Sequence, residues 1–290
     1  NRPMPMQHVF FGFQLMHFLR DLLKLLDFFL RSQFLTREQR FFLIKYFFFG
    51  IHPPKKTNIY SLKHMDTGAE EGLRQGEAAT HHLGGEAFVN VETSIEKTIR
   101  SVARVNIFTE KEVKTVGANG EIVSQKIEVY SGNGTGFMVS KNGYMATNRH
   151  VAEHKGAKLF VTTEDGRILR ATVVFLHPAF DFALLKVEDE GFEVAPLGDS
   201  TTLKRGEDVH VIGHPLGSEK AHETPGIVNC PHDESQPPYM LKEGMTLDEI
   251  EKIYGGMIAT DAAAHHGNSG GPLLDKDGKV LGIMTNAKFG

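Results

Sequence analysis

The sequence predicts an all-β fold for most of the chain, from about residue 86 onward. Short apolar runs recur there, and Ala103, Val105 and Ile107 alternate with polar neighbours as in a half-buried strand. Glycines and Asn-Gly or Asp-Gly turns separate these runs. A hydrophobic content of 40% and a charged content of 23% are ordinary for a globular protein. We therefore expect a barrel or sandwich of many short strands.

Further strands are expected at regular intervals along this region. They cover residues 137–139, 159–161, 171–174, 183–185, 209–212 and 280–284. A helix is expected over residues 246–253, inside a long polar stretch. Since the last strand is followed by only a few residues up to Gly290, the strand that would close a barrel is expected to be missing.

Residues 1–50 differ from the rest because they hold more than half of the 21 phenylalanines. Arg20, Lys24, Asp27 and Arg31 follow one another at steps of three and four, which places them on one face of a helix. Leucine and phenylalanine fill the other face, and a second helix is expected from Thr36 to near residue 50. Two readings stay open: an amphipathic hairpin lying in a membrane interface, or a helical pair packed against protein. No uncharged apolar run reaches the roughly 18–20 residues that a spanning helix needs.

Composition also divides the chain and excludes some functions. Residues 51–84 are rich in charges, glycine and proline and lack apolar periodicity, so we expect a linker before a domain over residues 85–290. The formal net charge is only −4, which gives no case for nucleic acid as a partner. The single cysteine, Cys230, excludes an intrachain disulfide.

The segment 267–273, Gly-Asn-Ser-Gly-Gly-Pro-Leu, carries the strongest chemical signal. Glycines on both sides of Ser269 permit a tight turn in which backbone N–H groups converge, as the oxyanion of an acyl-transfer reaction requires. The candidate donors are the amides of Gly267 and Ser269. A glycine-rich hairpin loop is the alternative interpretation of the same residues.

A serine nucleophile needs a base, and the base needs a carboxylate that holds its tautomer. The chain has 15 histidines, and His150 stands out among them because it follows a strand, a turn and a second short strand. Asp181 lies between two phenylalanines at the start of an apolar strand, where a carboxylate is costly unless it is paired. A surface histidine and a turn-capping aspartate remain the alternatives for these two residues.

In this order, His150, Asp181 and Ser269 with their flanking segments resemble the trypsin-like serine peptidases, and more narrowly the HtrA/Deg type. The resemblance rests on residues 134–140, 147–151, 181–187, 213–217 and 260–273. It implies a trypsin-type double six-stranded β-barrel, with His150 and Asp181 from the first barrel and Ser269 from the second. It also implies a serine endopeptidase that needs no metal and no organic cofactor. One departure is His265-His266, where the family usually has Asn-Pro.

Substrate-binding residues are expected on both sides of the nucleophile. The strand edge at Thr285, Asn286 and Ala287 can bind an extended peptide through its backbone. Ala263 and Ala264 should lie at the specificity pocket, and the lack of an acid there favours cleavage after small or medium aliphatic residues.

The resemblance further implies unfolded or extended polypeptides as substrates, and oligomerisation stays open. Residues 1–50 favour membrane association, on a periplasmic or organellar side. Two rival functions remain: a viral polyprotein-type protease, in which membrane-associated helices precede a trypsin-like domain, and a non-catalytic peptide-binding chaperone on the same fold.

Overall fold

The computed structural model describes residues 7–11, 19–24, 93–116, 121–177, 181–233, 257–263 and 265–288. Residues 1–24 and 92–290 form one compact unit, which contains all of these ranges. The predicted linker over 51–84 and the helix expected over 246–253 lie outside the described residues.

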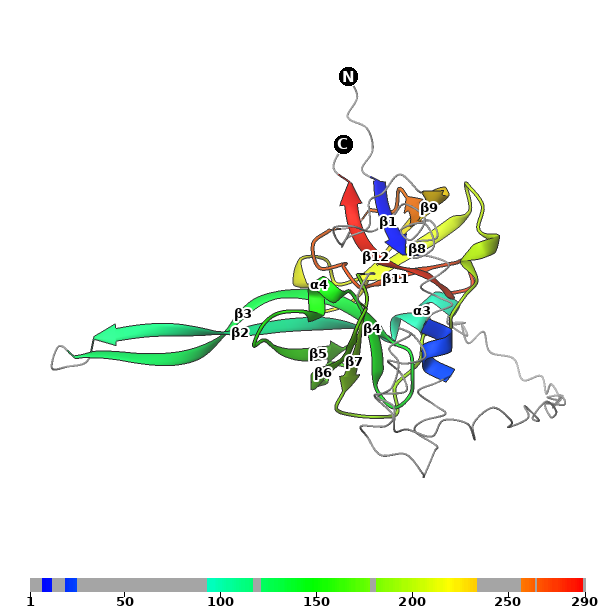
Figure 1. Ribbon diagram of the computed structural model, residues 1–290. Helices are drawn as coiled ribbons and strands as arrows, with labels where there is room; N and C mark the ends of the chain where they lie inside the picture. Colours follow the sequence, from blue (N-terminus) through cyan, green and yellow to red (C-terminus); the bar gives the residue numbers. More distant parts are fainter. Residues whose placement is uncertain are drawn as a thin grey trace, which may run out of the picture. The chain divides into compact units, whose positions relative to one another are not determined.

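The first barrel closes from six consecutive strands (Figure 1). They are β2 (Val102–Val116), β3 (Ile122–Met138), β4 (Tyr144–Thr147), β5 (Lys158–Thr163), β6 (Ile168–Leu176) and β7 (Ala183–Val187), in the order β2-β3-β4-β7-β6-β5. Along β5 every second residue is buried, as the period of a strand with one inward face requires. Val105, Met145, Val161 and Leu185 belong to the core that these inward faces form.

The second barrel also has six strands, and one of them comes from the start of the chain. The strands are β1 (Gln7–Phe11), β8 (Asp208–Gly213), β9 (His222–Asp233), β10 (Met257–Thr260), β11 (Pro272–Leu274) and β12 (Val280–Lys288). Their order is β1-β10-β9-β8-β11-β12, around a core that includes Val211, Val228, Ile258 and Leu273. Two short 3-10 helices, η1 (Ser200–Thr202) and η2 (Pro215–Gly217), lie between strands. The predicted all-β fold with two six-stranded barrels is confirmed.

Strand β1 corrects the expectation that a closing strand is missing. It pairs antiparallel with β10 from His8 to Phe11 and with β12 from Gln7 to Phe11, so it fills the gap between them. The sequence prediction considered a closing strand only at the carboxyl end of the domain, and it assigned residues 1–50 to an amphipathic helical segment. Strand residues 7–11 escaped it because this run of only five residues lies in a phenylalanine-rich stretch that was read as helical throughout.

Residues 19–24 are helical as predicted, but this helix does not offer its apolar face for membrane binding. The side chains of Leu19 and Leu22 are fully buried, and Arg20 Nη2 donates to the carbonyl of Leu197 at 3.2 Å and to that of Gly198. For these residues the packed alternative holds. The rest of the predicted helical pair, residues 25–50, lies outside the described residues. Among the residues that are described, no helix is long and apolar enough to cross a membrane.

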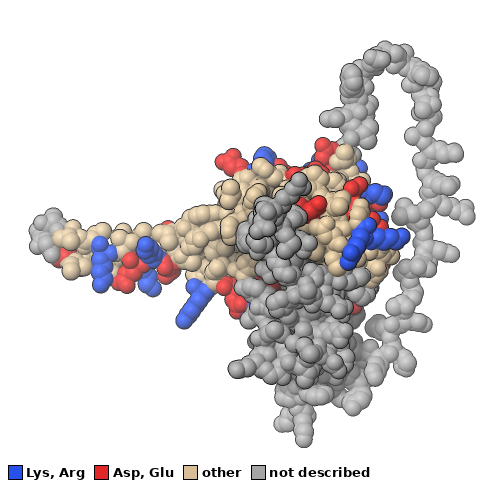
Figure 2. Space-filling view, turned by 90° about the horizontal axis from the view of Figure 1, so that it is seen from above, with Lys and Arg blue, Asp and Glu red and all other residues tan. Residues whose placement is uncertain are grey.

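Strands β2 and β3 continue past the first barrel as a two-stranded arm, which Figure 1 shows pointing away from both barrels. Their pairing runs without interruption from Phe108↔Tyr130 to Val116↔Ile122. Figure 2 shows acidic and basic side chains along the arm, and Lys126 lies 3.5 Å from Glu110 across the two strands. The sequence prediction found only the barrel ends of these strands, because the arm lacks buried residues that would mark its length.

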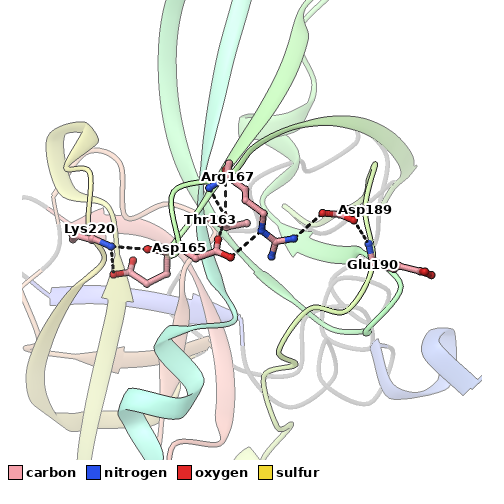
Figure 3. A network of polar contacts seen from close by, with 7 residues as sticks. Thr163, Asp165, Arg167, Asp189, Glu190 and Lys220 are labelled. Carbon is pink, nitrogen blue, oxygen red and sulfur yellow. Dashed lines mark hydrogen bonds and ion pairs between the residues drawn. The ribbon is translucent and has the colours of Figure 1, made fainter.

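The polar network drawn in Figure 3 includes a contact between the two barrels. Lys220, from the segment before β9, donates to the carbonyl of Glu164 after β5 at 2.5 Å. Beside it Arg167 contacts Asp165 at 2.9 Å and Asp189 at 2.7 Å. Such exposed pairs contribute about 0–1 kcal/mol each, so they orient this surface more than they stabilise the fold.

A short helix, α3 (Ser94–Ile99), precedes the first barrel and contacts the second. A capping box between Thr93 and Glu96 begins it. Its buried Thr98 donates from Oγ1 to the carbonyl of Gly278, in the turn between β11 and β12, at 2.7 Å.

Candidate active site

His150 lies in α4 (Arg149–Ala152), a single helical turn directly after β4. Val151 and Ala152 are buried and hold this turn against the first barrel. Arg149 Nη1 donates to the carbonyl of His177 at 2.8 Å, which ties the turn to the segment before Asp181. The side chain of His150 keeps 30% of its surface exposed, so the imidazole is packed on one side and open on the other.

Asp181 is completely buried, and both of its carboxylate oxygens are occupied. Oδ1 accepts from the backbone N–H of His150 at 2.9 Å, and Oδ2 lies 2.6 Å from His150 Nδ1. Oδ2 also accepts from Thr285 Oγ1 at 2.6 Å. Three hydrogen bonds offset the cost of burying this charge. Because an ionised carboxylate only accepts, the ring proton lies on Nδ1 and Nε2 is left as an acceptor.

The loop around Ser269 is built on glycines that no other residue could replace. Gly267 has φ +100 and Gly270 has φ +88, in the left-handed region. A Cβ on Gly267 would lie 2.3 Å from the carbonyl oxygen of His214, and one on Gly270 would lie 2.1 Å from that of Thr135. The two glycines therefore allow the loop to approach both barrels closely.

The backbone amides of this loop fall into two sets. Those of Asn268, Gly270 and Gly271 donate to the carbonyls of His265, Met284 and Asn268 at 2.9–3.0 Å. Within the part of the chain that the structure describes, the amides of Gly267 and Ser269 donate to no backbone carbonyl. These two are the amides that the sequence predicted as oxyanion donors.

Two histidines near the site are buried in the neutral form. Burial, with a smaller contribution from Arg149, lowers the pKa of His177 to about 3. Burial also lowers the pKa of His214, although its hydrogen bond to the Ser218 carbonyl acts in the opposite direction. Neither ring can act as a base toward Ser269 without first losing this packing.

The predicted substrate-binding residues have different positions. The side chain of Thr285 is buried and donates to Asp181, so it supports the carboxylate. The expected peptide binding concerns the backbone of Thr285 and stays a prediction. Asn286 and Ala287 lie on β12 and pair with β1 along one edge. Ala263 is exposed, and Ala264 lies outside the described residues.

Sequence reasoning gave no role to two buried polar residues around the site, Thr135 and Asn148, and gave Thr285 a different one. Asn148 Nδ2 donates to the carbonyl of Asp181 at 2.9 Å, and the Thr135 hydroxyl donates to the carbonyl of Gly267. Both residues lie inside the ranges 134–140 and 147–151 that carry the resemblance, and that position was the available signal. Across the described ranges, no group of three or more His, Cys, Asp or Glu side chains is placed to hold a metal ion.

Comparison with known proteins agrees with this geometry. The family model of the trypsin-like peptidase domain matches residues 134–283, a little more than half of the chain. The chain therefore belongs to the trypsin-like peptidase family.

Within this family the chain is similar to the HtrA/DegP type. A probable periplasmic serine endoprotease, DegP-like, of Chlamydia pneumoniae is 38% identical over 52% of this chain and 28% of its own length. A relative of the same description from Hahella chejuensis is 41% identical over 52% of this chain and 29% of its own. Among solved structures, the HtrA-type protease AlgW with decapeptide aligns with a TM-score of 0.51 and 27% identity, over 67% of this chain and 58% of that one. The chain thus matches less than a third of the curated relatives' length.

Proposed function

We propose that this protein is a serine endopeptidase of the HtrA/DegP type, with His150, Asp181 and Ser269 as its catalytic triad. The observation that carries the proposal is the buried Asp181 carboxylate, which holds His150 Nδ1 at 2.6 Å and the His150 backbone at 2.9 Å. This arrangement orients Nε2 as a proton acceptor, which a structural histidine would not need.

The reaction follows from these positions. His150 Nε2 takes the proton of Ser269 Oγ as that oxygen bonds to the peptide carbonyl carbon, and the negative oxygen that results accepts from the amides of Gly267 and Ser269. His150 then gives the proton to the leaving amine, the C–N bond breaks, and an ester to Ser269 remains. Water, deprotonated by His150, attacks this ester. The bond to Ser269 Oγ then breaks, His150 returns the proton to that oxygen, and the carboxyl product leaves.

We infer that an extended polypeptide binds along β12 near Asn286 and Ala287, and that small or medium aliphatic residues precede the cleaved bond. Residues 286–288 pair with β1 on one edge, which leaves the other edge without a strand partner among the described residues. The acid nearest in sequence to Ala263 is Asp261, whose Oδ1 already accepts from the N–H of Ile227 at 2.8 Å. Peptides with valine or with lysine before the cleaved bond would test this preference.

Labelling and turnover test the proposal together. The intact chain should react with a serine-directed phosphonate and cleave unfolded casein. Ser269→Ala should lose the label and reduce turnover by a factor on the order of a million, as removal of a triad nucleophile does. Casein binding without label or cleavage would instead support the rival, a non-catalytic chaperone. The viral-protease alternative is not proposed further, because the relatives are DegP-like proteins of bacteria.

Membrane binding stays a proposal for residues 25–50 alone, since Leu19 and Leu22 are buried. Six phenylalanines between residues 34 and 49 support it. Liposome flotation of the intact chain and of a variant with these six changed to serine would test it. Equal flotation of the two would contradict it.

A further inference from the structure

Thr135 lies in the first barrel, on β3, but its polar atoms connect to the loop of the second barrel that carries Ser269. The residue is completely buried. Its N–H donates to the carbonyl of Ser269 at 2.8 Å, and its hydroxyl donates to the carbonyl of Gly267 at 2.6 Å. The Thr135 hydroxyl and the Thr135 amide thus fix the carbonyls of Gly267 and Ser269. These are the two residues whose own amides we assign to the oxyanion site.

The remaining polar capacity of Thr135 is used as well. Its Oγ1 accepts from the N–H of His214 at 3.0 Å, and its carbonyl accepts from Thr147 Oγ1 at 2.7 Å. Thr147 is the last residue of β4, three residues before His150. Thr135 therefore links the strand that leads to the base with the loop that carries the nucleophile.

Because peptide bonds are planar, the contacts of Thr135 with the two carbonyls also affect the orientation of the neighbouring amides. The amide of Ser269 belongs to the peptide unit between residues 268 and 269. The units on either side of it carry the carbonyls of Gly267 and Ser269, and Thr135 holds both. Because each unit is a rigid plane, the two contacts with Thr135 fix the planes on either side of the unit that carries the Ser269 amide. The carbonyl of that middle unit, which belongs to Asn268, accepts from the N–H of Gly271 at 2.9 Å, and this bond restrains its own rotation.

The orientation of the Gly267 amide also depends on Thr135. The Gly267 amide belongs to the peptide unit between residues 266 and 267, and the carbonyl of that unit, from His266, accepts from the N–H of Leu216 at 2.6 Å. The next unit along the chain carries the Gly267 carbonyl, which accepts from the Thr135 hydroxyl. Gly267 itself, at φ +100, has no side chain that would restrict its rotation. The contact with Thr135 supplies that restriction.

We propose that Thr135 is a positioning residue for the reaction: its hydroxyl keeps the Gly267 and Ser269 amides aimed at the oxyanion. The proposal rests on the function proposed above, and it concerns only the step in which the oxyanion forms. It requires the hydroxyl group itself and not merely the volume of the threonine.

Three substitutions separate the hydroxyl from the fold. Thr135→Val keeps the shape and removes the hydroxyl, whereas Thr135→Ser keeps the hydroxyl. Thr98→Val is the matched control, because Thr98 is also buried and also donates to a glycine carbonyl, at 2.7 Å, but in the turn between β11 and β12. Displacing an oxyanion donor lowers kcat by a factor on the order of 100 to 1,000. We therefore expect Thr135→Val to lower kcat about a hundredfold with KM within about threefold.

The serine variant and the control should both stay within about threefold of wild-type kcat, a difference of less than half of one decade. A second readout isolates the oxyanion. A peptide boronate, which forms a tetrahedral adduct with Ser269, should bind Thr135→Val about a hundredfold more weakly, in parallel with kcat. The same peptide without the boronate should bind equally well to Ser269→Ala and to the double variant Thr135→Val, Ser269→Ala, in which no cleavage disturbs the measurement.

Several outcomes would overturn the proposal. It fails if Thr135→Val keeps kcat within about threefold, if Thr135→Ser loses as much as Thr135→Val, or if boronate affinity and plain-peptide affinity fall together. If the valine variant does not fold, Thr135→Ala carries the same comparison. Failure of both variants to fold, while Thr98→Val folds, would make Thr135 a structural residue only. Activity that survives Ser269→Ala would contradict the proposed function itself, and this result is independent of Thr135.

Discussion

Replacing Asp181 by asparagine should leave the fold intact and fix His150 in the wrong tautomer. The reason lies in how the two carboxylate oxygens are used. Oδ1 accepts from the backbone N–H of His150 at 2.9 Å, so only the amide oxygen can take that place. The amide nitrogen must then take the place of Oδ2, 2.6 Å from His150 Nδ1 and 2.6 Å from the Thr285 hydroxyl. There it donates to Nδ1, and the ring proton moves to Nε2.

The size of the loss follows from what this exchange removes. A ring protonated at Nε2 cannot accept the Ser269 proton, and the imidazolium formed in the transition state loses its anionic partner. A hydrogen bond to a charged acceptor contributes about 1.5–3 kcal/mol, and reversing the tautomer adds a cost of similar size. We expect kcat to fall by about ten-thousandfold, which corresponds to about 5.5 kcal/mol of barrier.

Steady-state cleavage of a short peptide substrate measures this loss, with thermal unfolding as the check on folding. Asp277→Asn, at an exposed turn position, is the matched control and should keep wild-type kcat. If Asp181→Asn kept kcat within tenfold of wild type while remaining folded, the assignment of His150 as the base would be wrong.

Four further predictions concern residues around the site and the barrels. Thr285→Val removes one of three hydrogen bonds to Asp181, so kcat should fall about tenfold, and an unchanged kcat would mean that this hydroxyl is dispensable. Gly270→Ala should prevent folding, as circular dichroism would show, because its Cβ would lie 2.1 Å from the Thr135 carbonyl oxygen. Deleting residues 1–11 removes β1 and should lower the free energy of unfolding by on the order of 5 kcal/mol in urea titrations, whereas a separable N-terminal segment would leave it unchanged. Finally, the pKa of His177 is lowered to about 3 in the folded state, so only the unfolded state gains a proton as the pH falls through about 6.5. The free energy of unfolding should therefore drop by about 2 kcal/mol from pH 7.5 to 5. His177→Phe should abolish most of that drop.

The all-β fold and the candidate triad could be predicted because both leave local signals, whereas the double barrel was implied by the resemblance to the trypsin-like peptidases. Alternating residues such as Ala103 and Ile107 mark an inward strand face, and Ser269 is surrounded by glycines that its turn requires. His150 and Asp181 lie directly before or within short buried segments, where a polar residue is conspicuous. The meeting of His150 with Asp181 was an expectation that the structure confirms at 2.6 Å.

The features that the sequence did not predict depend on partners far away in the chain. The pairing of β1 with β12 joins residues 7–11 to residues 283–288, and no local pattern in either segment announces the other. Thr285 was expected to bind substrate through its backbone, and its hydroxyl contact with Asp181, 104 residues away in the chain, was not foreseen. Thr135 has the same property: its contacts with Gly267 and Ser269 exist only after the two barrels have formed.

The pairing of β1 with β12 sets an order in which the protein can become active during synthesis. All six strands of the first barrel lie between residues 102 and 187, so this barrel, with His150 and Asp181, can close while the rest of the chain is still being made. The second barrel has to wait, because among the described strands β1 is made before all the others and β12 after all the others. Contacts of such long sequence separation also form slowly. A nascent chain would therefore hold the proposed base and its carboxylate before the loop around Ser269 is assembled, and the proposed cleavage would begin only after β12 has paired with β1.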